Sequence, residues 1–190
     1  MERKLATVLF VDLVDSTGLV AGSDPEVVRQ RVNRYFDEVS RCIKTHGGTV
    51  EKFAGDAVMA AFGVPRAHED DAERGLRAAL NIIPAVHELG MEARIGVEAG
   101  EVVVEDAEST FATGEAVNLA ARLQQAAPEG GILIGPGVMR LADDLGIGAG
   151  DEPGRVDEVD EEHGGQLPLH ASSVRSGPQA RPAPFGAFSP

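Results

Sequence analysis

Apolar and polar positions alternate along the chain in blocks that predict short strands and helices. The run ATVLFVDLV at residues 6–14 is apolar except for Asp12, as expected of a buried strand. Valine, phenylalanine and isoleucine then recur at helical spacing, which predicts a helix that Gly47 ends. The segments expected to be regular are a strand at 6–14, a helix at 23–46, strands at 49–53 and 57–62, a helix at 69–89 with a kink or early end at Pro84, two strands within 92–105 that turn at Ala99-Gly100, a helix at 114–125, a strand at 131–134 and a helix at 137–145.

The order strand, helix, strand, strand, helix, strand predicts an α+β fold, a ferredoxin-like βαββαβ sandwich with a C-terminal extension. The pattern changes after residue 147, where glycine, proline and acidic residues dominate and periodicity is lost. Such a composition cannot bury enough apolar surface to fold on its own. We therefore expect a folded domain at 1–147 and an acidic, Gly/Pro-rich, disordered tail at 148–190.

The overall charge limits the partners. The chain has 190 residues, with 17 lysines and arginines against 31 acids, and a formal net charge of −14. Nucleic-acid backbones and anionic membranes would repel it, so neither is expected as a partner. The single cysteine excludes an internal disulfide, and the N-terminal apolar run is too short to cross a membrane. A cytoplasmic location is expected.

Two aspartates stand in or beside apolar strands. Asp12 interrupts the first strand, and Asp56 follows a turn glycine and opens the strand AVMAAF. These strands are neighbours in a ferredoxin-like sheet, so the two carboxylates can face each other, and they repel unless a cation lies between them. Such a pair suits Mg²⁺ or Mn²⁺ together with substrate phosphates. The alternative is structural: Asp12 caps a turn and Asp56 satisfies the hairpin backbone.

Polar side chains on a predicted helix and on the hairpin are further candidates. In GEAVNLAARLQ, Asn118 and Arg122 are four residues apart and share one helix face, where they could bind a sugar oxygen and a phosphate. Lys52 precedes Asp56 by four residues on the incoming strand of the hairpin. The alternative is that all three are ordinary solvent-exposed surface residues.

Several stretches together, in this order, resemble the catalytic domain of class III nucleotidyl cyclases, the adenylate and guanylate cyclases. They are TVLFVDLVDST, HGGTVEKFAGDAVMAAFG, ARIGVEAGEVVV, GEAVNLAARLQ and GGILIG, and they cover about residues 5–145. The resemblance implies the class III cyclase fold and an adenylate cyclase that makes 3′,5′-cyclic AMP and pyrophosphate from ATP in intracellular signal transduction. It also implies a head-to-tail homodimer with shared active sites, each with two Mg²⁺ or Mn²⁺ ions.

The resemblance assigns roles to individual residues. Asp12, Asp56 and the backbone carbonyl of Leu13 hold the metals, which lower the pKa of the ribose 3′-hydroxyl and hold the phosphates. Asn118 acts across the dimer interface on the ribose, and Arg122 acts across it on the charge that develops at the α-phosphate. The substrate-binding residues implied in addition are Lys52 at the base, and Ser16, Thr17 and Gly18 at the phosphates.

The chain departs from the family at two places. Phe111 stands where adenylate cyclases usually carry an Asp or Thr that reads the adenine amino group, so base reading is expected to move to Thr113 or to the backbone. No lysine follows Lys52, although the family often supplies one near the C-terminal end to hold the triphosphate. Two alternatives stay open: a guanylate cyclase, which Lys52 disfavours, and a catalytically weak or inactive cyclase-like module that regulates or dimerises.

Overall fold

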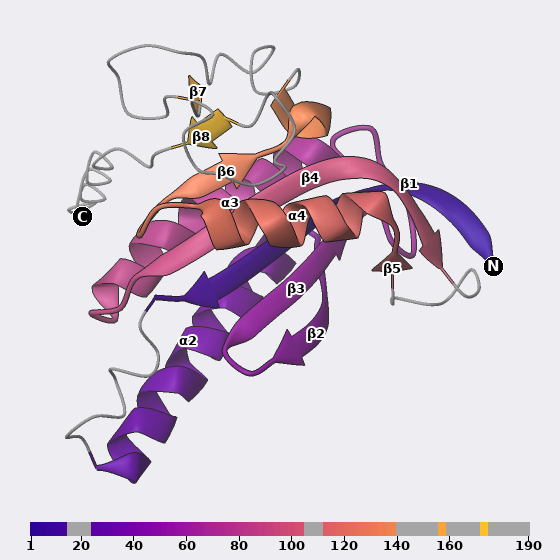
Figure 1. The fold of residues 1–190 in the computed structure, drawn as a ribbon. Helices are drawn as coiled ribbons and strands as arrows, with labels where there is room; N and C mark the ends of the chain where they lie inside the picture. The colour runs from indigo at the N-terminus through magenta and orange to yellow at the C-terminus, as the bar shows by residue number, and fades with distance from the viewer. Residues whose placement is uncertain (15–23, 105–111, 140–155, 159–171, 175–190) are drawn as a thin grey trace, which may run out of the picture.

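A sheet with helices on both faces forms the body of the molecule (Figure 1). The computed structural model describes residues 1–14, 24–104, 112–139, 156–158 and 172–174. The elements of the described ranges are β1 Glu2–Leu13, α2 Pro25–Thr45, β2 Thr49–Ala54, β3 Ala57–Phe62, α3 Asp71–Glu88, β4 Ala93–Val104, β5 Ala112–Thr113, α4 Glu115–Ala126, β6 Ile132–Ile134, β7 Val156–Glu158 and β8 Ser172–Val174.

The strand order confirms the predicted fold class. The sheet runs β2-β3-β1-β4-β6-β8-β7, and β5 pairs with β4. Its first four strands, β2-β3-β1-β4, are antiparallel to their neighbours, which is the arrangement of a ferredoxin-like sandwich. β6 then joins β4 in parallel and extends the sheet. The order places the end of β1 beside the β2–β3 turn.

The prediction of two strands within residues 92–105 is wrong. β4 is one strand of 12 residues, and it pairs with β1 along its whole length. Gly100, expected in a turn, lies inside this ladder opposite Ala6. A Cβ atom at Gly100 would lie 3.1 Å from the methyl group of Ala116 on α4. The glycine therefore makes room for a helix and does not form a turn.

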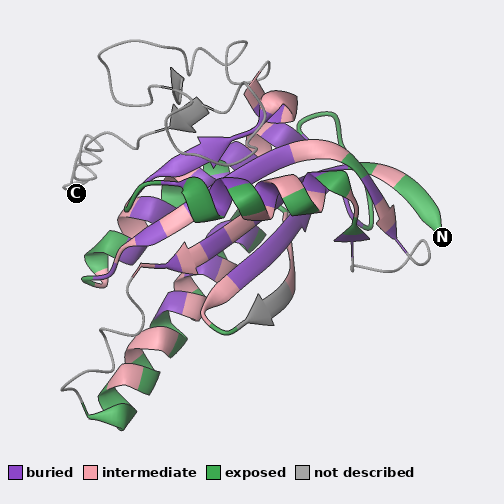
Figure 2. Cartoon of the chain, in the orientation of Figure 1, coloured by how far each residue is buried: buried purple, intermediate pink, exposed green. Residues whose placement is uncertain are grey.

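The larger core lies between the sheet and the helices α2 and α3. Asp24 caps α2 by accepting a hydrogen bond from the amide of Glu26 at 2.8 Å, and Pro25 occupies the first turn, where a proline is tolerated. α3 continues through Pro84 to Glu88, so the proline does not end the helix. The central strands are buried, and the beginning of α2 is exposed (Figure 2). The largest fully buried side chains of this core are Leu9, Tyr35, Ile43, Phe62, Leu76, Ile82, Ile95, Ile132 and Ile134.

α4 covers the opposite face of the sheet and approaches it unusually closely. A Cβ atom at Gly96 of β4 would lie 2.2 Å from the carbonyl oxygen of Ala120 and 2.3 Å from the amide nitrogen of Gln124. No side chain fits between strand and helix at this point, so their backbones are in direct contact. This contact fixes the position of α4 on the sheet.

Two short strands extend the sheet beyond residue 147. β8 pairs antiparallel with β6 and with β7, and both lie in the segment for which the sequence predicts a disordered tail. A helical turn at 136–139 follows β6, where a helix was expected. Most of residues 148–190 lies outside the described residues, so the domain boundary at 147 stays a prediction. Among the helices of the described ranges, none is both long and apolar enough to cross a membrane.

Candidate active site

The carboxylates of Asp12 and Asp56 meet at one end of the sheet. Val11 of β1 pairs with Val58 of β3, which brings the end of β1 beside the turn that carries Asp56. Leu13 and Val11 pack into the core on the α2–α3 side, so Asp12 between them faces the α4 side. The fold therefore brings the two carboxylates close together, as the sequence predicted.

Burial and like charge make it unfavourable for both carboxylates to be ionised when no cation is bound. Burial raises the pKa of Asp12, the charge of Asp56 raises it further, and hydrogen bonds from the backbone at Leu13 and from Gln124 only partly offset the rise. Two like charges at close range in a partly desolvated site favour protonation unless a cation neutralises them. A cation bound between the two carboxylates would therefore stabilise their ionised forms.

Gln124 of α4 reaches the same site and was not singled out from the sequence. The residue is 7% exposed, and its Nε2 lies 3.5 Å from Oδ2 of Asp12, a long hydrogen bond. A signal for it exists: Gln124 is a polar residue on the stripe of α4 that otherwise buries Ala116, Ala120 and Leu123. Because α4 is fixed on the sheet at Gly96, the amide of Gln124 is held over Asp12.

The donor set fits a divalent cation with an open side. Carboxylate oxygens are the hard ligands that Mg²⁺ and Mn²⁺ prefer. Within the described part of the chain, no three histidine, cysteine, aspartate or glutamate side chains gather in a metal-binding group. The two aspartates would therefore depend on water, backbone or phosphate oxygens to complete the coordination, as is usual for magnesium at phosphate-transfer sites.

The hydroxyl group of Tyr35 is buried in the same region. The side chain is fully buried, and its oxygen has no hydrogen-bond partner among the described residues. Burial raises the pKa of Tyr35, and the charges of Asp12 and Asp56 raise it further. The acid pair is therefore close enough to the apolar core to affect a buried group, where charges interact more strongly than in water.

Asn118 and Arg122 lie on the other side of α4. Both side chains are exposed, whereas Gln124 is buried against the sheet. The expected helix and the four-residue spacing are present, so the two side chains share one outward face. Within one chain it is Gln124 that contacts Asp12, and the Asn118–Arg122 face is open to solvent.

Thr113 lies at the opposite end of the β1–β4 ladder from Asp12. It pairs with Val103, which lies opposite Arg3 in β1, and its hydroxyl donates to the carbonyl oxygen of Val103 at 3.4 Å. The backbone of Lys52 pairs with Met59, but its side chain is not described. The predicted residues outside the described ranges are Ser16, Thr17, Gly18 and Phe111.

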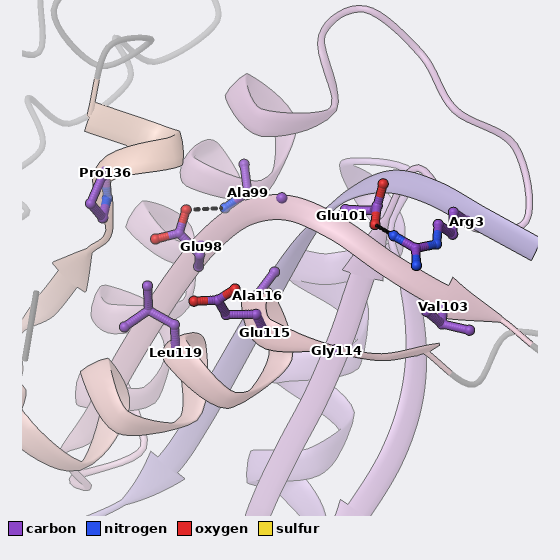
Figure 3. Close-up of a pocket in the computed structure, with 11 residues that line it drawn as sticks. Arg3, Glu98, Ala99, Glu101, Val103, Gly114, Glu115, Ala116, Leu119 and Pro136 are labelled. Atoms are coloured by element: carbon purple, nitrogen blue, oxygen red, sulfur yellow. Dashed lines mark hydrogen bonds and ion pairs between the residues drawn. The ribbon is translucent and has the colours of Figure 1, made fainter.

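A cavity of about 400 Å³ lies elsewhere, between β4 and the start of α4 (Figure 3). Glu98, 4% exposed, accepts hydrogen bonds there from the amides of Ala99 and Gly137, each at 2.9 Å. Arg3 pairs with Glu101 at its rim. With Glu115 the lining has three carboxylates and one guanidinium, a charge balance that does not suit a triphosphate.

The fold and the acid pair together define a class of protein, the nucleotidyl cyclase catalytic domain. The chain belongs to the adenylate and guanylate cyclase catalytic domain family, whose pattern it matches over residues 2–158. This match covers most of the described elements and includes both aspartates. The resemblance seen in the sequence is therefore confirmed at the level of the family.

The curated relatives include uncharacterised proteins and one protein named an adenylate cyclase. An uncharacterised protein of Mycobacterium tuberculosis is 38% identical over 129 residues, which cover 64% of this chain and 24% of that protein. Adenylate cyclase 1 of Rhizobium meliloti is 30% identical over 137 residues, which cover 64% of this chain and 21% of that protein. The chain thus spans about a quarter of the length of these curated relatives.

Among solved structures, the guanylyl cyclase Cya2 is similar with a TM-score of 0.74 and 28% identity, over 97% of this chain and 96% of that one. The chain is therefore similar both to a protein named as an adenylate cyclase and to one named as a guanylyl cyclase. These similarities do not distinguish ATP from GTP as the substrate, so that distinction has to come from the residues of the site.

Proposed function

We propose that this chain is an adenylate cyclase catalytic domain that converts ATP to 3′,5′-cyclic AMP and pyrophosphate in intracellular signal transduction. The observation that carries the proposal is the pair of partly buried carboxylates, Asp12 and Asp56, in the fold of a cyclase family. A structural role for the pair would leave their repulsion uncompensated. A role in binding cations for phosphate chemistry explains it.

The metal-binding residues are Asp12, Asp56 and the backbone carbonyl of Leu13, with two Mg²⁺ or Mn²⁺ ions per site. When bound, such ions acidify the ribose 3′-hydroxyl and neutralise charge on the phosphates. The hydroxyl attacks the α-phosphate in line and pyrophosphate leaves. The amide of Gln124 faces the carboxylate of Asp12 at 3.5 Å, and the ladder between β1 and β4 fixes the backbone that carries Asp12.

The other half of the site belongs to a second copy of the chain in a homodimer. Asn118 orients the ribose, and Arg122 offers a planar fork of donors to the α-phosphate as its charge grows. The exposure of both side chains supports this arrangement, because residues that act across an interface must face outward from their own chain. By symmetry the homodimer has two complete sites. The remaining substrate contacts are Lys52 and Thr113 near the base, and Ser16, Thr17 and Gly18 at the phosphates.

Adenine is favoured by Lys52 and by the similarity to a protein named adenylate cyclase. Guanine is the second candidate, and the similarity to Cya2 supports it. Phe111 cannot accept a hydrogen bond from an adenine amino group, and the hydroxyl of Thr113 is turned to a backbone carbonyl. Base selection therefore depends on how the segment around residue 112 is held.

Product formation tests the proposal. The protein is incubated with ATP or with GTP, in Mn²⁺ or in Mg²⁺, and the products are separated by chromatography against cyclic-nucleotide standards. We expect cyclic AMP from ATP. Cyclic GMP as the main product would replace the proposal by a guanylate cyclase. No cyclic product from a folded, dimeric protein would identify a regulatory module without turnover.

Mixing two inactive variants tests the shared site. Asp56→Ala and Arg122→Ala each remove one half of the site, and a mixed dimer regains one complete site. We expect partial activity after the two variants are mixed and allowed to exchange subunits. Each variant mixed with itself serves as the control. A confirmed mixed dimer without activity would contradict the shared arrangement.

A further inference from the structure

Glu51 is the extra residue of a β-bulge. Val50 of β2 pairs with Ala60 and Lys52 pairs with Met59, which leaves Glu51 without a partner in the ladder. A bulge bends its strand and redirects a side chain, and bulges are common beside functional sites. Here the side chain of Glu51 extends from β2 to β5, where its carboxylate accepts a hydrogen bond from the amide nitrogen of Ala112 at 2.8 Å. Two segments that are 61 residues apart in the sequence are thereby tied together.

The surroundings of this carboxylate lower the stability of the folded protein. The second oxygen, Oε1, is buried and has no hydrogen-bond partner among the described residues. Burial raises the pKa of Glu51, and the hydrogen bond from Ala112 only partly offsets the rise. A buried polar atom that lacks a partner destabilises a protein. A residue kept in such a place despite the cost points to a role beyond packing.

The segment that Glu51 holds leads directly into α4. Ala112 and Thr113 form β5, and Gly114 caps α4 with a φ of +140° and no side-chain hydrogen bond. A Cβ atom at Gly114 would lie 3.1 Å from the carbonyl oxygen of Glu101, so the turn is tightly packed. Because the helix lacks a side-chain cap, the place where it begins is set from outside, by the β4–β5 pairs and by Glu51.

We propose that Glu51 is a positioning residue for the nucleotide: its carboxylate fixes the spacing between the strand of Lys52 and the segment of Thr113 that leads into α4. The inference rests on the proposed function, because it assigns these two segments to the base and ribose of a bound nucleotide. Asp56 lies in the turn at the far end of the same hairpin, five residues from Glu51. The role of Glu51 is thus separable from metal binding.

Three substitutions separate the possible roles. Glu51→Ala removes the acceptor and leaves the amide of Ala112 without its partner. Glu51→Gln is the matched control, because it keeps an acceptor oxygen at the same reach and removes only the charge. Glu51→Asp keeps the charge and shortens the reach by one methylene group. It also provides a folded test if Glu51→Ala does not fold, which thermal melts monitored by circular dichroism decide.

The first readout is steady-state turnover. We expect Glu51→Ala to raise the KM for ATP by about tenfold, Glu51→Asp to raise it by a smaller factor, and Glu51→Gln to stay within about twofold of the wild type. The Mn²⁺ concentration for half-maximal rate should be the same in all four proteins. A general loss of structure would lower kcat and shift the Mn²⁺ dependence as well, and that outcome would overturn the proposal.

The second readout does not need turnover. A fluorescent ribose-labelled ATP analogue is titrated into each protein with Mn²⁺, and deuterium uptake is followed in peptides from residues 112–126. We expect weaker analogue binding and faster uptake in Glu51→Ala, and wild-type behaviour in Glu51→Gln. Unchanged binding in a folded Glu51→Ala would overturn the proposal. A wild type that binds the analogue but makes no cyclic product would overturn the proposed function alone, and a wild type that binds nothing would overturn both.

Discussion

Asp71 and Asp12 are two acids at the ends of apolar elements, and their neighbours differ in charge. Asp71 begins α3 and is only 6% exposed. Its carboxylate pairs with the guanidinium of Arg74 and accepts a hydrogen bond from the amide of His68 at 2.6 Å. Asp12 lies next to the last residue of β1 and faces the carboxylate of Asp56, and its hydrogen bonds come only from neutral groups, the backbone at Leu13 and the amide of Gln124.

The difference separates a carboxylate that serves the fold from one that, in the proposed function, binds a cation. The charge of Asp71 is balanced inside the chain, so removing it takes the buried partner from Arg74, which keeps only the exposed Asp70 as a carboxylate partner, and from the amide of His68. The charge of Asp12 is opposed inside the chain, so removing it relieves a repulsion. The same residue type thus stabilises the protein at one site and opposes a like charge at the other, where we propose that a cation binds. The variants below test this contrast, from the largest effect to the smallest.

Asp12→Ala should produce the largest change, and it should be a change in activity. We expect the rate of cyclic nucleotide formation to fall by about a thousandfold or more, because a metal-binding carboxylate is lost. The midpoint of thermal unfolding without metal should stay at or above that of the wild type. Asp12→Asn, which keeps the size of the side chain, should behave in the same way. Substantial activity in either variant would remove Asp12 from the metal site.

Asp71→Ala should change stability and leave turnover per folded molecule unaltered. We expect the free energy of unfolding, measured by urea denaturation, to fall by roughly 3 kcal/mol, because Arg74 and the His68 amide lose a buried partner. Asp70→Ala is the matched control, since Asp70 also pairs with Arg74 but is exposed. That control should cost less than about 1 kcal/mol. Equal costs for the two variants would contradict the structural role given to Asp71.

Glu51 is a third, partly buried carboxylate, with neither the cation partner of Asp71 nor the like-charged neighbour of Asp12. Replacing it should change the free energy of unfolding by less than replacing Asp71 does, and by an amount that depends on pH. Burial raises the pKa of Glu51 in the folded protein. The folded state therefore binds the proton more tightly than the unfolded state, and stability falls as the pH rises from the ordinary value of 4.5 through the raised one. Glu51→Gln cannot ionise. We expect it to exceed the wild type in free energy of unfolding at pH 7 and to match it at pH values well below 4.5.

Urea denaturation of the wild type and Glu51→Gln over a series of pH values measures this difference. Asp71→Asn is a suitable comparison, because it removes a charge that is already paired and should be less stable than the wild type at pH 7. A stability difference between Glu51→Gln and the wild type that does not vary with pH would show that the buried charge is not its cause.

The sequence predicted the ferredoxin-like fold class and the meeting of Asp12 with Asp56, because long apolar runs and turn glycines mark the elements and the fold class makes the first strand a neighbour of the hairpin. It failed at β4, where Gly100 resembles a turn residue but instead, like Gly96, lets α4 approach the strand. The need for those glycines comes from a helix about 20 residues later in the chain, which no local pattern contains.

The site was predicted only in part for a similar reason. Gln124 could have been found as a polar residue on a buried stripe, but its contact with Asp12 depends on how closely α4 approaches the sheet. The bulge at Glu51 has no signature in the sequence, because a bulge is a property of two paired strands. The roles of Asn118 and Arg122 stay predictions, since both face solvent and a second chain decides what they touch.

The contact at Gly96 has a consequence for the proposed shared active site. A backbone contact leaves a helix less room to shift on a strand than a contact between side chains does, because side chains can change rotamer. Gln124 and Arg122, which both lie on α4, are therefore held in position relative to the sheet and to Asp12. In a dimer with shared sites, catalytic alignment is then set by how two rigid chains dock. In the proposed homodimer, a change in the docking angle would therefore change the rate while leaving each chain unchanged.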